Sequence, residues 1–351
     1  MLTARILTRR TFAAAGLGLT LLTLAACGDD GTSPGPAGTG ANGKPAPAKI
    51  TIQIDGAAVP YYAPLYVAKE KGYFAKQGLD VDFVYADAST VLKNVAAGSV
   101  QLGFPNGDAV LAAAANGVPV KVIHSTYQQG IGAVLSQASK GINSPADLKG
   151  KTVAVTSLGS PNYVQLQVMA GQNNLDVKKD MKVKVVGTST IVDAVKTGEV
   201  DAIVFSRLRY YALKNAGIEV NQILTDQFLP SYGNVLVTSD AYLKDNPGVA
   251  KRFVAAFDEA LTYIIDGNAK QAVELAISEY APDFKGQEAA ITTIMDEVFI
   301  KDLWQSKGTK ANGLGWADLD RWQKAIDIQK QYGLISKDIK AADFVMQPKA
   351  L

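Results

Sequence analysis

Two stretches of the chain place polar and aromatic side chains directly after a predicted strand. The alternating pattern of residues 50–54 predicts a half-buried strand, and residues 55–64 then hold Asp55, two tyrosines and two prolines. About a hundred residues later the strand pattern 151–156 is followed by a second Gly/Pro turn, 157–163. In open α/β sheets, ligands bind at the carboxyl ends of the strands. We therefore expect both stretches to face a bound small molecule.

The candidate ligand-binding residues lie at the end of a predicted strand or at the start of the following helix. Helix starts offer unpaired backbone N–H groups and a favourable dipole to anions and carbonyl oxygens. The candidates from the first half of the chain are Asp55, Tyr61, Tyr62, Phe104, Asn106 and Asp108. Those from the second half are Ser157, Gly159, Ser160, Asn162, Tyr163, Ser206 and Arg207, with Tyr127 and Tyr232 near the segments that connect the two halves.

Several candidates also have a purely structural explanation. Tyr61 and Tyr62 could be core or surface aromatics, although neighbouring turn residues do not easily both pack inward. Ser160 and Asn162 could simply cap the helix that follows them, and a cap can also contact a ligand. These alternatives stay open at the level of the sequence.

Two charged candidates are open in the same way. Asp108 could contact the ligand or could only interact with the dipole of an early helical turn. Arg207 is the candidate best suited to bind an anionic group of the ligand. Arg209 follows closely, however, and the two arginines could instead form a solvated pair on the surface.

A repeated pattern predicts two similar lobes. Residues 91–104 and 191–204 both read as helix, glycine and strand, and Gly98 and Gly198 fall in step. The alternative is one continuous doubly wound domain. Residues 133–135 and 231–237 are predicted to cross between the lobes, and the chain beyond them is mostly helical. The predicted division is a signal peptide at 1–26, a disordered tether at 27–48, a discontinuous first lobe at 49–131 and 234–351, and a second lobe at 132–233.

The N-terminus has the features of an export signal. Arg9 and Arg10 form a twin-arginine pattern, and the apolar run 13–26 is too short to span a membrane. The run ends in Leu-Ala-Ala-Cys, which resembles a bacterial lipoprotein signal with Cys27 as the acylated residue. Cys27 is the only cysteine, which excludes an internal disulfide framework. The alternatives are an uncleaved anchor or a cysteine of no consequence.

Charge and motif content exclude several classes of protein. The chain has 35 Lys and Arg residues against 33 Asp and Glu residues, so no polybasic nucleic-acid surface is expected. The single histidine, His124, lies in a predicted strand and is expected to be a core or hinge residue rather than a catalyst. A G-x-S-x-G pattern at residues 31–35 and a G-x-G-x-x-G pattern at residues 38–43 both fall in the predicted tether, where no predicted strand precedes them as either motif requires. No P-loop or Cys/His metal set is found. We therefore expect neither an enzyme nor a cofactor or metal.

Four segments carry a resemblance to a known family. They are APLYVAKEKGYFAKQGLDVDF, SPADLKGKTVAV, GEVDAIVF and LVTSDAYLKDNPGVAKRFVAAFDEAL. Together, over about Lys49 to Phe344, the chain resembles the solute-binding proteins of bacterial ABC importers for taurine, alkanesulfonates, nitrate and thiamine-pyrimidine precursors.

The resemblance implies an α/β, two-lobed periplasmic-binding-protein fold of type II with a helical C-terminal part. It implies a monomer that closes on a small molecule, with an ABC permease and ATPase as partners and a lipid holding it at the cell envelope. Presentation of the ligand to a sensor is the alternative. A eukaryotic relative makes the thiamine pyrimidine by sacrificing a histidine, but the cysteine-rich motif of that enzyme is absent here.

The ligand's chemistry is only weakly indicated by the sequence. A sulfonate or nitrate needs convergent donors and a positive charge, whereas a flat heterocycle needs aromatic faces and a few polar edges. The candidate set is rich in aromatic residues, contains two aspartates and has one arginine. This favours a planar heterocycle, such as a pyrimidine precursor of thiamine or a flavin-like compound, over an anion.

Overall fold

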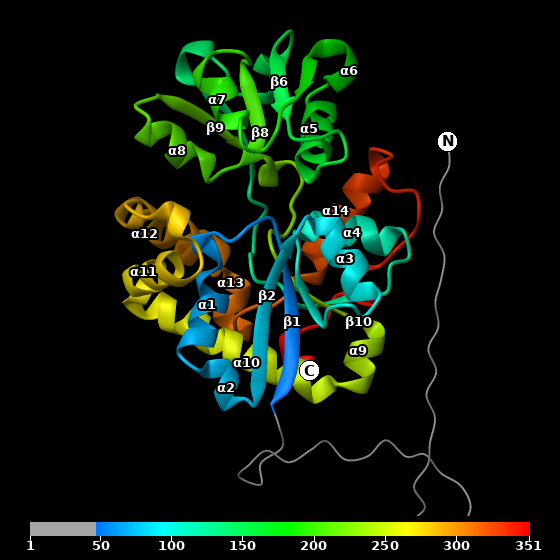
Figure 1. Ribbon diagram of the computed structural model, residues 1–351. Helices are drawn as coiled ribbons and strands as arrows, with labels where there is room; N and C mark the ends of the chain where they lie inside the picture. Colours follow the sequence, from blue (N-terminus) through cyan, green and yellow to red (C-terminus); the bar gives the residue numbers. More distant parts are fainter. Residues whose placement is uncertain (1–46) are drawn as a thin grey trace, which may run out of the picture. The chain divides into compact units, whose positions relative to one another are not determined.

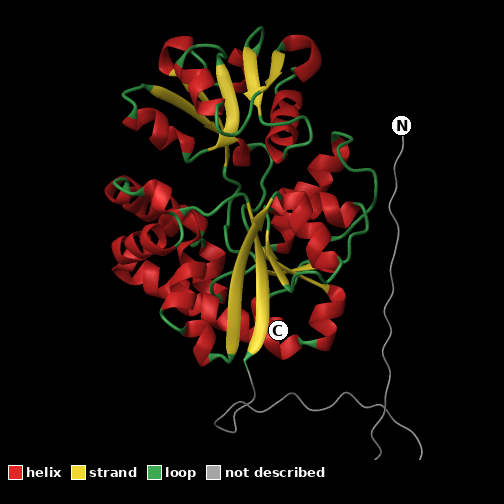
Figure 2. Cartoon of the chain, in the orientation of Figure 1, coloured by secondary structure: helices red, strands yellow, loops and turns green. Residues whose placement is uncertain are grey.

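The computed structural model describes residues 47–351, in which strands and helices alternate before a mostly helical C-terminal part (Figures 1 and 2). The predicted signal peptide, Cys27 and nearly all of the predicted tether lie outside the described residues. Strand β1 begins at Ala48, which is the last residue of the predicted tether.

The first sheet takes strands from two separate stretches of the chain, residues 48–124 and 236–239. Its order is β2-β1-β3-β10-β4, in which β10 runs antiparallel to both of its neighbours. The strands are β1 (Ala48–Asp55), β2 (Leu79–Ala86), β3 (Leu102–Phe104), β4 (Val120–His124) and β10 (Leu236–Ser239). Because β10 follows all strands of the second sheet in sequence, the first lobe is discontinuous, as predicted.

The second sheet repeats this arrangement. Its order is β7-β6-β8-β5-β9, and again the fourth strand, β5, runs antiparallel to its neighbours. The strands are β5 (Gly132–Gln137), β6 (Thr152–Val155), β7 (Lys182–Val185), β8 (Ala202–Ser206) and β9 (Val220–Leu224). In both sheets, therefore, the first, second and third parallel strands occupy equivalent places.

The sequence repeat has a backbone counterpart. Gly98 ends the helix before β3 with φ +72°, and Gly198 ends the helix before β8 with φ +75°. This left-handed region favours glycine, which explains why both repeats carry one. The prediction that residues 133–135 cross between the lobes is wrong, because these residues form the body of β5. The exact lobe boundaries remain a prediction.

Helices cover the first sheet on both sides, and helices α5 to α8 accompany the second sheet (Figure 1). The helices of the first two-thirds of the chain are α1 (Ala63–Glu70), α2 (Tyr73–Lys76), α3 (Ala88–Ala96), α4 (Gly107–Ala115), α5 (Pro161–Gln172), α6 (Val177–Asp180), α7 (Ile191–Lys196) and α8 (Arg209–Asn215). The C-terminal helices are α9 (Asp240–Asp245), α10 (Pro247–Tyr263), α11 (Ala269–Glu279), α12 (Glu288–Ile294), α13 (Lys307–Asn312), α14 (Leu319–Gln331) and α15 (Ala341–Phe344), with a π-helical stretch, η7 (Met295–Leu303).

Helix α10 illustrates how the C-terminal part completes the first lobe. Phe253, Phe257 and Leu261 recur at four-residue spacing and are almost fully buried against β1 and α1 residues of the same cluster. Burial of each such side chain contributes about 1.5–3 kcal/mol. A segment two hundred residues away in sequence thus fixes the position of β1, whose end carries Asp55.

Two connections run side by side between the sheets. The backbone N–H of Tyr127 donates to the carbonyl of Asn234 at 3.0 Å, and the N–H of Gly233 donates back to Tyr127. The N–H of Gly107 at the start of α4 donates to Gly233 at 2.8 Å. These two connections are therefore tied directly to α4, the helix that carries Asp108.

Candidate functional site

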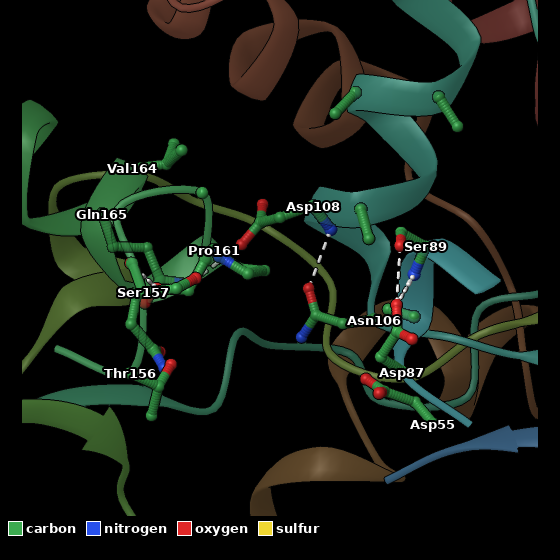
Figure 3. A pocket seen from close by; sticks show the side chains of 18 of the residues that line it. Asp55, Asp87, Ser89, Asn106, Asp108, Thr156, Ser157, Pro161, Val164 and Gln165 are labelled. Atoms are coloured by element: carbon green, nitrogen blue, oxygen red, sulfur yellow. Dashed lines mark hydrogen bonds between the residues drawn. The ribbon is translucent and has the colours of Figure 1, made fainter. Parts of the chain in front are cut away.

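A cavity of about 990 Å³ lies between the two sheets, where the carboxyl ends of their parallel strands face each other. Its lining includes the last residues of β1 and β8 and the loops or helix starts that follow β2, β3, β6 and β7. Figure 3 shows Asp55, Asp87, Asn106 and Asp108 on one side and Thr156, Ser157 and Gln165 on the other.

The first lobe supplies carboxylates to this lining. Asp55 is the last residue of β1, and Asp87 follows β2 as the N-cap of α3. After β3, Asn106 caps α4 by accepting from the N–H of Asp108 at 2.9 Å. Three acidic side chains therefore converge on one wall, because three neighbouring strands end there.

The three carboxyl groups differ in pKa, because hydrogen bonding dominates at Asp87 and burial dominates at Asp55 and Asp108. Asp87 accepts from two backbone N–H groups and from the hydroxyls of Ser89 and Thr90, bonds that hold its pKa far below its usual range. Burial, assisted by the charge of Asp87, raises the pKa of Asp55 to about 6. Burial also raises the pKa of Asp108 to about 6, against a hydrogen bond from Gln165 that lowers it. The charged forms of Asp55 and Asp108 would therefore be stabilised by a hydrogen-bond donor on a ligand.

The second lobe supplies neutral groups. Thr156 and Ser157 follow β6, and Ser160 caps α5 by accepting from the N–H of Tyr163. Thr188 follows β7, and Ser206 ends β8. Among the described residues that line the cavity, Lys93 carries the one cationic side chain. The cavity therefore has more negative than positive charge.

Eight of the residues predicted from the sequence line this cavity. They are Asp55, Asn106, Asp108, Ser157, Gly159, Ser160, Asn162 and Ser206. Tyr61, Tyr62, Phe104, Tyr127, Tyr163, Arg207 and Tyr232 do not belong to the lining.

The aromatic residues outside the lining pack against one another. Tyr61 stacks on Phe299 with ring centroids 5.2 Å apart, and Phe104 meets Tyr62 and Tyr127 edge to face. The Tyr62 hydroxyl donates to the backbone carbonyl of Asp55 at 2.5 Å. In this arrangement these rings support the strand ends and do not offer a face to the cavity.

The other two tyrosines have partners of their own. Tyr232 stacks on Trp322 at 4.8 Å and donates and accepts hydrogen bonds with the backbone of Asp318. Tyr163 belongs to the apolar cluster of the second lobe.

Arg207 is held by a carboxylate. Its side chain is 8% exposed and its guanidinium donates to Asp302 in η7, 2.5 Å away. Arg209 instead lies over the Phe205 ring. The two arginines therefore do not form a solvated pair, and Arg207 already has an anionic partner from the first lobe.

The sequence reasoning missed eight residues of the lining that have polar side chains able to contact a ligand: Asp87, Ser89, Lys93, Asn116, Thr156, Gln165, Thr188 and Gln329. Asp87 had a usable signal, because an aspartate followed by Ser89 and Thr90 after a strand is a typical N-cap. Gln165 had none, since its role depends on Asp108 across the cavity.

Gln165 joins the lobes. Its Nε2 donates to Asp108 Oδ2 at 2.9 Å, and its Oε1 accepts from Thr225 at 3.0 Å. It is one of several polar links between elements of the two lobes, which include the ion pairs Arg207–Asp302 and Arg321–Asp226.

In the described part of the chain, no three His, Cys, Asp or Glu side chains are grouped so as to hold a metal ion. Within residues 47–351, no helix combines the length and apolar character needed to cross a membrane.

Comparison with known proteins gives relatives of similar length. The riboflavin-binding protein RibY of Chloroflexus aurantiacus is 25% identical over 331 residues, which cover 92% of this chain and 93% of RibY. The formylaminopyrimidine-binding protein of Halalkalibacterium halodurans is 25% identical over 303 residues, covering 84% of this chain and 88% of that protein.

Solved structures show the same fold. The periplasmic aliphatic sulphonate-binding protein SsuA of Escherichia coli superimposes with a TM-score of 0.68 at 18% identity, covering 85% of this chain and 97% of SsuA. The α/β, periplasmic-binding-protein fold predicted from the sequence is thereby confirmed. The model of the family described as "NMT1/THI5 like" matches residues 59–270, and the chain belongs to that family.

Proposed function

We propose that this protein is the extracytoplasmic solute-binding component of an ABC importer and binds a planar, N–H-bearing heterocycle. The ligand class we propose is that of a thiamine pyrimidine precursor or a flavin. The relatives support this class, since one is named for riboflavin and another for formylaminopyrimidine.

The observation that carries the proposal is the excess of carboxylates in the cavity. Asp55, Asp87 and Asp108 face a lining with one lysine, Lys93. A carboxylate about 4 Å from an anionic ligand raises the energy of the bound ligand by roughly 1 kcal/mol in water and by roughly 4 kcal/mol in a partly desolvated site. An amino group or ring N–H gains from the same groups by donating to them.

The alternative ligand is an anion such as taurine, another alkanesulfonate or nitrate. The likeness to SsuA supports the fold and does not favour this ligand, because the identity is 18%. Arg207, the residue best suited to hold an anion, is already paired with Asp302.

A ligand panel tests the proposal. The folded protein should gain thermal stability from a tight ligand by mass action, by roughly 2.7 kcal/mol at a hundredfold excess over Kd. We expect an aminopyrimidine or riboflavin to raise the melting temperature and taurine and nitrate to leave it unchanged. A melting temperature raised by taurine or nitrate and not by the heterocycles would show that the ligand is an anion.

We propose binding without catalysis. His124 is fully buried, and its two ring nitrogens lie 2.8 Å from Thr126 and 2.9 Å from Asp258. His124 does not line the cavity, so the histidine-consuming chemistry of the eukaryotic relative has no matching residue among those described. Ligand recovered chemically unchanged after long incubation would agree with this, and a modified ligand would refute it.

We further propose that Cys27 carries a lipid that keeps the protein at the outer face of the cytoplasmic membrane, beside its permease and ATPase. The support is the sequence signal before Cys27. The variant Cys27→Ser should move the protein from the membrane fraction to the soluble fraction. A protein that remains in the membrane fraction would contradict the lipid anchor.

The partner is tested separately, because a receptor for a sensor would bind its ligand equally well. Deletion of the gene should abolish uptake of labelled ligand if the protein serves an importer. Unchanged uptake combined with a lost transcriptional response would assign it to a sensor.

A further inference from the structure

The cavity continues beyond the strand ends along α4. Its lining includes Asp108, Ala112 and Asn116, which lie at successive turns on one face of this helix and just past its end. Asp108 and Asn116 are eight residues apart, which corresponds to about 12 Å of helix. The space along α4 is therefore longer than a single six-membered ring requires.

The walls of this extension are mostly apolar and come from three elements. Helix α4 contributes small alanine side chains, α5 contributes Val164, and the end of α14 and the residues after it contribute Gln329 and Leu334. Figure 3 shows Val164 and Gln165 across the cavity from Asp108. Alanines along one helix face leave a flat wall, which suits a flat ligand.

Two buried polar atoms in this extension have no partner. Asp108 is 5% exposed and Gln329 is 2% exposed. In the part of the chain that the structure describes, Asp108 Oδ1 and Gln329 Nε2 have no hydrogen-bond partner. Unsatisfied buried groups are rare in proteins, and each destabilises the fold unless a ligand or water satisfies it.

These two atoms have complementary chemistry. The carboxylate oxygen can only accept at neutral pH, and the amide nitrogen can only donate. One is on α4 and the other on α14, and both residues line the same cavity. A ligand that satisfies both needs an N–H group and a carbonyl or ring nitrogen acceptor on one extended, uncharged frame.

We infer that the extension along α4 is a subsite for a fused-ring heterocycle. Its N–H donates a hydrogen bond to Asp108 Oδ1, and its carbonyl or ring nitrogen accepts a hydrogen bond from Gln329 Nε2. This inference rests on the proposed function and narrows it from heterocycles in general to those with more than one ring. A single-ring pyrimidine would leave the α4 extension to water.

The test compares a fused-ring probe with a single-ring probe. Riboflavin and 4-amino-2-methylpyrimidine are titrated into the wild-type protein and into Ala112→Phe, which fills the extension. Wild type should bind riboflavin at least tenfold more tightly than the pyrimidine, and Ala112→Phe should reduce that preference at least tenfold. Ala289→Phe, the same change at an exposed position of α12 outside the cavity, should leave it unchanged.

A second variant separates ligand contact from structural damage. Gln329→Leu removes a buried donor that has no protein partner, so the unliganded protein should melt at the same temperature or higher. Its affinity for riboflavin should nevertheless fall at least threefold. A lowered melting temperature with unchanged affinity would assign Gln329 a structural role and overturn its part in the subsite.

Failure of the subsite can be told apart from failure of the proposed function. If wild type binds the pyrimidine as tightly as riboflavin, or Ala112→Phe keeps the full preference, the subsite is wrong and the heterocycle proposal stands. If neither probe binds wild type, both are wrong.

Discussion

The two lobes have the same strand order but present opposite chemistry at equivalent positions. At the ends of the first, second and third parallel strands, the first lobe has Asp55, Asp87 and the Asn106–Asp108 pair, and the second has Thr156, Thr188 and Ser206. The two lobes therefore share one architecture, but the first lobe presents charged carboxylates to the cavity and the second lobe presents neutral hydroxyl groups.

This difference indicates how a ligand would be held. Neutral hydroxyls can donate or accept, so the second lobe can adapt to many polar edges. Carboxylates accept only, so the first lobe selects for ligands that donate. Selectivity is then expected to reside in the first lobe, and closure onto the ligand in the second.

The largest expected effect is on affinity. Asp55→Asn and Asp108→Asn should each weaken binding of the heterocycle by about 10- to 150-fold, because a hydrogen bond to a charged group contributes about 1.5–3 kcal/mol. Thr156→Val and Ser206→Ala should weaken it by only about 2- to 12-fold, as expected for neutral hydrogen bonds. Isothermal titration at pH 7 measures both sets. Equal losses on the two sides would remove the distinction between the lobes.

The next effect is on stability as a function of pH. The pKa of Asp108 is about 6 in the folded protein against an ordinary 3.8, so the folded state holds a proton that the unfolded chain releases. The free energy of unfolding should therefore fall as the pH rises from about 4 to 6, by roughly 2–3 kcal/mol for this carboxyl. Asp108→Asn should remove this carboxyl's share of the fall in urea unfolding, and Asp55, whose pKa is also about 6, should keep the rest.

Asp87 provides a control of opposite sign. Its pKa is lowered by its capping hydrogen bonds, so its contribution is present at neutral pH and lost as the pH falls through the acid range. Asp87→Asn should destabilise the protein at pH 7 and have little effect in strong acid. A fall in the free energy of unfolding from pH 4 to 6 that Asp108→Asn leaves unchanged would contradict the assignment of Asp108.

A smaller effect is expected at Tyr62, which supports the acidic wall from behind. Its hydroxyl donates to the Asp55 carbonyl, and Tyr62→Phe removes this bond while keeping the edge contact with Phe104. We expect a loss of about 0.5–1.5 kcal/mol of stability with affinity changed by less than threefold. A large loss of affinity at unchanged stability would instead place the Tyr62 hydroxyl in contact with the ligand.

The smallest effect is expected at the Arg207–Asp302 pair between the lobes. Asp302 is 44% exposed, which limits the strength of the pair, so a double-mutant cycle of Arg207→Met and Asp302→Asn should give a coupling of about 1 kcal/mol in unfolding. Zero coupling would show that the pair does not link the lobes in solution.

The sequence predicted those features that depend on local pattern. The repeat of residues 91–104 at 191–204, the helix-start positions of Asn106 and Ser160, and the strand-end position of Asp55 all follow from neighbouring residues. Eight predicted residues therefore line the cavity.

Features that depend on distant partners could not be predicted. Tyr61 faces Phe299 and Tyr232 faces Trp322, and both partners come from the C-terminal helical part of the chain. The pairing of Arg207 with Asp302 has the same origin. No local pattern distinguishes an aromatic ring that faces a cavity from one that packs against a helix two hundred residues later.

The most direct test of the account is a titration of the wild-type protein with riboflavin and with taurine in the same buffer at pH 7. The account predicts saturable binding of riboflavin and none of taurine, because the cavity wall is acidic. Tight binding of taurine without binding of riboflavin would contradict it.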